Sequence, residues 1–158
     1  MAAKVFKCGS QSFDLTARTH VMGVLNVTPD SFSDGGLYLE PEAAIQQAAR
    51  MIEEGADIID IGGESSRPAG PYGQGAETVS EEEEKRRTVR VIEAIASKFN
   101  TPISIDTVKA GVARAAIDAG ATIVNDISGL QKDPGMCEVI SSRNASTVIM
   151  HMKGMPQT

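Results

Sequence analysis

Short apolar runs rich in branched residues alternate along the chain with longer segments of helical periodicity. This alternation is typical of repeated strand and helix units that build a parallel sheet. Each run is almost continuously apolar, as expected for strands covered on both faces. We therefore predict a short hairpin or lid at residues 4–15, followed by five strands at residues 21–27, 58–62, 103–106, 123–126 and 147–151.

The segments between these strands carry helix signals. Residues 41–54 place apolar side chains on one face and end at Gly55, which can adopt the left-handed cap. A second helix should begin at Ser80, because Glu83 completes a capping box and residues 81–84 place negative charge at the positive end of the helix dipole. Its buried face is predicted to contain Ile92, Ile95, Ala96 and Phe99.

Two further helices are expected between the later strands. The third should start after Asp106 with Thr107 as its N-cap, and Gly120 should end it. The fourth is predicted at about residues 134–142.

Composition narrows the possible classes of protein. A chain of 158 residues with 41% hydrophobic positions suits one or at most two domains. A formal net charge of -6 argues against broad nucleic-acid binding, which needs a basic face. No apolar run approaches the roughly 20 residues that span a bilayer, and no signal sequence opens the chain, so we expect no membrane partner. Cys8 and Cys137 stand far apart without a pairing motif, which favours the reducing cytoplasm.

Polar side chains cluster at the predicted carboxyl ends of the strands, where ligands bind in parallel α/β folds. Any one of them could simply cap a helix or support a neighbour. Together they predict a ligand site on one edge of the sheet. They are Asn26, Asp60 with Glu64, Asp106, Asn125 with Asp126, and His151.

Two loops add more specific signals. Residues 26–36 follow the first strand and combine turn formers with hydroxyls, carboxylates and Phe32. Residues 62–79 form a connection far longer than the usual two to six residues or so, which favours a functional lid or a disordered insertion. This second loop begins with glycines, serines and Arg67, groups that suit an anion.

In these two loops the chain resembles the dihydropteroate synthases of folate biosynthesis. Residues 22–36 (MGVLNVTPDSFSDGG) resemble the first signature of that family, and residues 60–68 (DIGGESSRP) resemble the second. Shorter matches follow at residues 105–107, 125–127 and 150–152, in the order of the family.

The resemblance implies a fold and a reaction. The fold would be an α/β structure with parallel strands in sequential order, the first five βα units of a TIM (β/α)8 barrel, and residues 1–158 would form the N-terminal portion of that single domain. The reaction would join p-aminobenzoate to 6-hydroxymethyl-7,8-dihydropterin pyrophosphate and release pyrophosphate with the help of Mg2+. The family also implies small-molecule substrates, sensitivity to sulfonamides and a homodimer in full-length members.

Individual residues receive roles from the same resemblance. Asn26 resembles the ligand of the metal and pyrophosphate, while Asp106 and Asn125 resemble the pair that reads the pterin ring. Ile127 and Met150 would supply apolar walls. The catalytic residues would be Asp106, Asn125 and Arg67. In the family, two loops bind p-aminobenzoate and pyrophosphate, and the residues that match them here are Phe32, Asp34, Ser66, Arg67 and Pro68.

The chain also departs from the family pattern. Ser66 stands where many members have Thr, and Ala69 separates Pro68 from Gly70. The family's strands six to eight, with their Asp-Pro-Gly, Ser-x-Lys and Arg-x-His segments, have no counterpart in these residues, because the Asp-Pro-Gly at 133–135 and the Arg-Thr-His at 18–20 precede the match at 150–152 and so fall outside the order of the family. Because eight units need about 250 residues, we expect little more than half a barrel, inactive alone and exposed at its strand edges.

Two alternatives remain open at this point. A pterin-binding methyltransferase would share the Asp106 and Asn125 pocket but would not need residues 26–36. A non-catalytic, flavodoxin-like domain would also fit the length, and its strand order of 2-1-3-4-5 distinguishes it from a barrel segment.

Overall fold

The computed structural model describes residues 4–27, 41–64 and 78–151. A hairpin of β1 (Val5–Cys8) and β2 (Gln11–Asp14) precedes a series of parallel strands and helices. The strands of that series are β3 (Met22–Asn26), β4 (Ile58–Gly62), β5 (Ile103–Asp106), β6 (Ile123–Asp126) and β7 (Ser146–Ile149). The helices are α1 (Pro41–Glu53), α2 (Glu81–Lys98), α3 (Ala110–Asp118) and α4 (Met136–Ser142).

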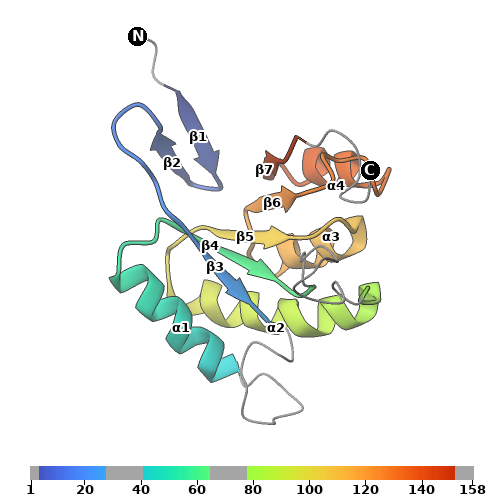
Figure 1. The fold of residues 1–158 in the computed structure, drawn as a ribbon, viewed down its shortest axis with the longest axis horizontal. Coiled ribbons are helices and arrows are strands. Elements are labelled where there is room, and N and C mark those ends of the chain that lie inside the picture. Colours follow the sequence, from blue (N-terminus) through green and yellow to red (C-terminus); the bar gives the residue numbers. More distant parts are fainter. Residues whose placement is uncertain (1–3, 28–40, 65–77, 152–158) are drawn as a thin grey trace, which may run out of the picture.

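The five strands form one parallel sheet in the order β3-β4-β5-β6-β7. Each strand therefore pairs with the one that precedes it along the chain, as expected for consecutive units of a barrel. The order rules out the flavodoxin-like arrangement, in which the first strand lies between the second and the third. Figure 1 shows the strands side by side, with α1 and α2 along one flank of the sheet and the hairpin near the end where β3 begins.

The main core lies between the sheet and the helices. Outward-facing strand residues such as Leu25, Ile59 and Ile105 pack there against small helix residues such as Ala48 and Ala116, and all of them are buried. Small side chains on the helices allow close approach to a sheet whose branched residues face them. Coverage on both faces was expected for every strand, but it holds only for β4, β5 and β6, which are mostly buried. Val24 of β3 and Ile149 of β7, at the two ends of the sheet, are 56% and 53% exposed.

The hairpin covers the end of the sheet at which the parallel strands begin. Its Cys8 packs against Ile58 and Ile123, near the start of β4 and of β6. The linker that follows the hairpin is anchored by Arg18, whose guanidinium donates to both carboxylate oxygens of Asp57. These hydrogen bonds hold the pKa of the Asp57 carboxyl well below its usual range. The predicted hairpin is therefore confirmed, and it covers the strand starts.

Helix boundaries agree with the sequence at most points. Gly55 and Gly120 follow α1 and α3 with φ of 106° and 121°, the left-handed conformation expected of a glycine cap. Ser80 caps α2, and its Oγ accepts from the Glu83 amide at 3.2 Å.

Three expectations about the helices were wrong. Lys109, rather than Thr107, is the N-cap of α3, because the Thr107 hydroxyl accepts from the Lys109 amide and forms a turn before the helix. The fourth helix starts at Met136, after a turn in which Asp133 accepts from the Gly135 amide. Ala96 is exposed, whereas the first turns of α2 bury Glu84 instead.

Within the described residues, no helix combines the length and the apolar character that crossing a membrane requires.

Candidate functional site

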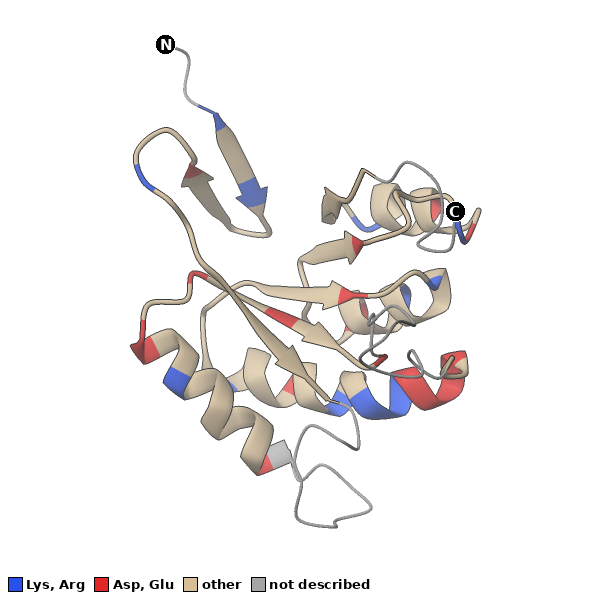
Figure 2. Cartoon of the chain, in the orientation of Figure 1, with Lys and Arg blue, Asp and Glu red and all other residues tan. Residues whose placement is uncertain are grey.

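Three of the candidate residues lie in one row at the carboxyl ends of the strands. The sheet register pairs Asn26 with Gly62, Gly62 with Asp106, and Asp106 with Asn125. Paired positions in a parallel sheet point to the same face, so these side chains project from the same side. In Figure 2 acidic positions mark β4 and the ends of β5 and β6.

Gly62 provides space at the centre of this row. A methyl group built on Gly62 would lie 3.5 Å from Asn26 Oδ1 and 3.7 Å from Asp106 Oδ2. An amide oxygen and a carboxylate oxygen therefore approach one point above a residue without a side chain. The arrangement leaves room for a ligand atom to contact both.

Asp106 is the most strongly perturbed group of this row. Burial, reinforced by neighbouring negative charges, raises its pKa to about 7. The charges belong to Asp60, Glu84, Asp126 and Glu64. At neutral pH the carboxyl group therefore exists in both protonation states, and a cationic ligand would favour the charged one.

This shift predicts that Asp106 makes folding stability dependent on pH. The pKa of Asp106 is raised in the folded chain, so the folded chain holds this proton more tightly than the unfolded one. Stability should therefore fall as the pH rises from about 4 to about 8. We expect Asp106→Asn to reduce this loss, so that urea unfolding finds the variant more stable than the parent at about pH 8 and equal to it at about pH 4. A variant less stable than the parent at the higher pH would contradict the expectation.

Asp60 and Asn125 form a direct contact inside the sheet. Asp60 lies in the middle of β4, where 3% of its surface is exposed, and its Oδ2 accepts a hydrogen bond of 3.1 Å from Asn125 Nδ2. Burial raises the pKa of the Asp60 carboxyl. Asp60 therefore lies beneath the row rather than at the edge of the sheet, where the sequence had suggested it.

A network of two carboxylates and one lysine borders the site. Lys109 Nζ donates to both Glu64 and Glu84, and the Glu84 side chain is only 1% exposed. The network joins Glu64, two residues after β4, to α2 and to the start of α3. Arg87 adds a hydrogen bond of 2.9 Å to the Gly63 carbonyl.

The remaining polar candidates do not converge on this row. Asp126 is buried, and its Oδ1 accepts from the Ser128 amide at 2.7 Å, so it stabilises the turn after β6. His151 is exposed. Of the two predicted apolar walls, Ile127 is half-buried and Met150 is 41% exposed.

Five of the predicted site residues lie outside the described residues, so their roles stay predictions. All of them belong to the two loops. They are Phe32, Asp34, Ser66, Arg67 and Pro68.

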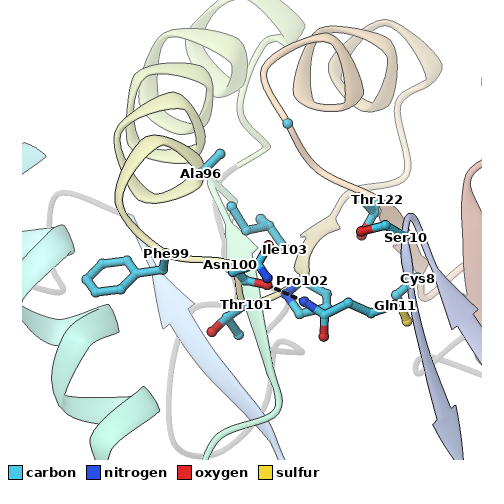
Figure 3. Close-up of a pocket in the computed structure, with 11 residues that line it drawn as sticks. Cys8, Ser10, Gln11, Ala96, Phe99, Asn100, Thr101, Pro102, Ile103 and Thr122 are labelled. Atoms are coloured by element: carbon cyan, nitrogen blue, oxygen red, sulfur yellow. Dashed lines mark hydrogen bonds between the residues drawn. The ribbon is translucent and has the colours of Figure 1, made fainter.

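A cavity of about 150 Å³ lies at the other end of the sheet, under the hairpin. Figure 3 shows Ser10 and Gln11 of the hairpin facing Thr101 and Thr122, and Gln11 donates a hydrogen bond to the carbonyl of Asn100. Among the residues that the structure describes, no charged side chain lines this cavity, and it is remote from the row of Asn26, Asp106 and Asn125. We therefore assign the candidate site to the carboxyl end of the sheet.

Sequence reasoning missed Lys109 and Glu84. Glu84 belongs to a run of four acidic residues that the helix dipole explains by itself, and no sequence signal distinguishes the buried member from the exposed ones. Lys109 lies three residues after Asp106, a spacing with no meaning until β5, α2 and α3 are placed together.

Comparison with known proteins agrees with this geometry. A family model described as "Pterin binding enzyme" matches residues 22–158. The chain therefore belongs to the family of pterin-binding enzymes.

The curated relatives are more specific. A dihydropteroate synthase from Clostridium beijerinckii is 50% identical over 145 residues, which cover 92% of this chain and 52% of that protein. The structure of Xanthomonas albilineans dihydropteroate synthase with 4-aminobenzoic acid matches with a TM-score of 0.85 and 44% identity, over 97% of this chain and 53% of that one. Yersinia pestis dihydropteroate synthase in a sulfonamide drug complex matches with a TM-score of 0.82 and 45% identity, with the same coverage.

These similarities confirm the resemblance to dihydropteroate synthases and the expected fold. The five described parallel strands correspond to part of a (β/α)8 barrel, and the chain spans about half the length of the relatives that it matches.

Proposed function

We propose that this chain carries the pterin-binding half of a dihydropteroate synthase, as the N-terminal portion of one barrel domain. The complete enzyme would condense 6-hydroxymethyl-7,8-dihydropterin pyrophosphate with p-aminobenzoate to 7,8-dihydropteroate and pyrophosphate. The observation that carries the proposal is the single row of Asn26, Asp106 and Asn125 around the space above Gly62.

The chemistry of these side chains suits the substrate. An aminopyrimidinone ring offers both donors and acceptors along one edge, which a carboxylate and an amide can pair with. Departure of pyrophosphate leaves positive charge on the pterin, and a carboxylate held in a buried place stabilises that charge. Asp106 would supply this carboxylate, and Asn125 would fix the position of the ring.

The nucleophile needs positioning more than activation. The aniline nitrogen of p-aminobenzoate is neutral at pH 7 and already carries its lone pair. Attack therefore depends on alignment with the pterin carbon and on an acceptor for the proton that is lost later. We propose that Phe32, Asp34, Ser66, Arg67 and Pro68 of the two loops provide this alignment and hold the leaving group.

Mg2+ fits the donor present at the end of β3. Mg2+ usually binds few protein ligands and completes its shell with water and substrate phosphate oxygens. The amide oxygen of Asn26, directed at the open space above Gly62, suits that role. Bound there, Mg2+ would neutralise the pyrophosphate as it departs.

The isolated chain should bind without turnover. In the described part of the chain, β3 and β7 are the two ends of the sheet and do not pair with each other, so the barrel is open. We expect the purified 158-residue chain to form no pteroate from the two substrates. Turnover by this chain alone would contradict the proposal of an incomplete site.

Isothermal titration tests the proposed ligand. We expect pterin pyrophosphate to bind more tightly with Mg2+ than without it, and Asn26→Ala to abolish this difference. Asp106→Asn should weaken binding by about tenfold, because it removes a charge-assisted hydrogen bond. Preferential binding of methyl-tetrahydrofolate, independent of Mg2+, would instead favour the methyltransferase.

The cellular context follows from the same proposal. Cys8 and Cys137 are both free thiols, which supports function in a reducing cytoplasm. We also propose that the complete protein is a homodimer and a target of sulfonamides, as the family resemblance implies.

A further inference from the structure

The side-chain amide of Asn125 has two orientations of nearly equal shape. Turning the amide over exchanges an acceptor for two donors, so that only the hydrogen-bond partners decide between the orientations. In the structure, Asn125 Nδ2 donates to Asp60 Oδ2 at 3.1 Å. The partner that selects the orientation is therefore a carboxylate on β4, which lies two strands away from Asn125 on β6.

Asp60 is well placed to make this selection. It is held in the middle of β4 and is 3% exposed, so its carboxylate has little freedom to move away from Asn125. The hydrogen bond from Asn125 favours the ionised form of Asp60 and so counteracts the effect of burial on its pKa. In that form the carboxylate accepts hydrogen bonds and donates none. The reversed orientation would place the amide oxygen of Asn125 against that carboxylate, which is repulsive and leaves two buried acceptors facing each other.

We propose that Asp60 is a positioning residue, which fixes the orientation of the Asn125 amide and thereby decides which groups the pterin site presents. The orientation of the Asn125 amide is independent of the proposed function, whereas its effect on pterin binding rests on that function. With one Nδ2 hydrogen engaged by Asp60, the Oδ1 atom and the second Nδ2 hydrogen of Asn125 remain to read a ligand. Asp60 itself would not touch the pterin.

The variant Asp60→Asn keeps a hydrogen bond to Asn125 but no longer favours one orientation of the Asn125 amide. The substituted amide has almost the same shape as the carboxylate and can either accept from Asn125 or donate to it. Both orientations of Asn125 are then satisfied, so packing is kept while the selection is lost. A merely structural role for Asp60 predicts that this change leaves Asn125 as it was.

NMR of the side-chain amide protons tests the structural part without any ligand. In the parent chain we expect one set of Asn125 Nδ2 signals that exchange with solvent more slowly than those of the exposed Asn100 and Asn144. In Asp60→Asn we expect two sets or exchange broadening. Thr147→Val, which removes a hydroxyl from the neighbouring strand β7 and leaves the Asp60 carboxylate and its hydrogen bonds in place, should resemble the parent.

Titration with 6-hydroxymethylpterin tests the functional consequence. We expect Asp60→Asn to weaken binding by about tenfold and Thr147→Val by less than about twofold, since only Asp60→Asn lets the Asn125 amide turn over and exchange the donor and acceptor that face the ligand. If the parent chain binds no pterin while the amide signals behave as expected, the proposed function fails and the positioning role stands. A single, protected set of Asn125 signals in Asp60→Asn would overturn the inference, as would rapid exchange of these protons in the parent chain.

Discussion

Lys109→Met should lower the free energy of unfolding by about 2–3 kcal/mol, because it leaves two carboxylates without their shared cation. The Glu84 side chain is almost completely buried, and Glu64 lies beside it in the same network. Removing one partner of a buried ion pair costs more than the pair contributes, since the remaining charge stays desolvated. Because Lys109 is 18% exposed, we place the effect at or just below the low end of the usual range of about 3–5 kcal/mol for buried pairs. Urea denaturation at neutral pH measures the loss.

Two further variants identify the origin of this loss. Lys85→Met removes an ammonium group that is itself half-buried but whose partners, Glu81 and Glu82, are 43% and 86% exposed, and should cost no more than about 0.5 kcal/mol. The double variant Lys109→Met with Glu84→Gln should recover part of the stability, because the buried charge is removed together with its partner. If Lys85→Met and Lys109→Met lowered the free energy of unfolding equally, the burial of Glu84 would not contribute to the effect.

The second large effect is expected at Gly63, one residue before Glu64. A methyl group on Gly63 would lie 2.8 Å from Thr88 Cγ2 and 3.3 Å from the backbone oxygen of Glu84. Because a helix backbone cannot yield as a side chain does, α2 would have to shift away from the end of β4. We expect Gly63→Ala to cost about 1–3 kcal/mol, the usual penalty for overpacking. Thermal and urea unfolding both report it.

Gly62→Ala is the matched control. The same methyl group on the preceding residue would meet its nearest neighbours at 3.5–3.7 Å, which is ordinary contact. We expect little change in stability, about 0.5 kcal/mol or less. The substitution would nevertheless fill the space between Asn26 and Asp106, so ligand binding should weaken although the fold persists. If Gly63→Ala proved as stable as Gly62→Ala, the close approach of α2 to this turn would be refuted.

The strands and helices could be predicted well because each of them is marked by residues within or next to its own segment. Continuous apolar runs locate the strands, and Gly55 and Gly120 end helices by a conformation that other residues rarely adopt. Adjacent strand ends then bring Asn26, Asp106 and Asn125 together through the order of the sheet alone. For the same reason these three positions were recognisable from the chain before any contact was known.

Contacts between distant segments were not predictable in this way. The pairing of Lys109 with Glu84 requires α2 to be placed against the start of α3, and the hydrogen bond from Asn125 to Asp60 requires the register of three strands. Local alternatives also misled the prediction at Thr107, whose hydroxyl suits a cap and a turn equally well. Helix starts therefore depend on which of two hydrogen bonds the tertiary structure permits.

The sequential order of the strands has a consequence for the way the chain is made. Each new strand finds its partner in the one synthesised just before it, so the sheet can grow at one edge as the polypeptide emerges from the ribosome. The hairpin is different, because its Lys7 carbonyl accepts a hydrogen bond from Ser146, at the far end of the chain. Among the described residues, the hairpin therefore gains this contact only after β7, the last of the five strands, has been made, although it precedes all of them along the chain.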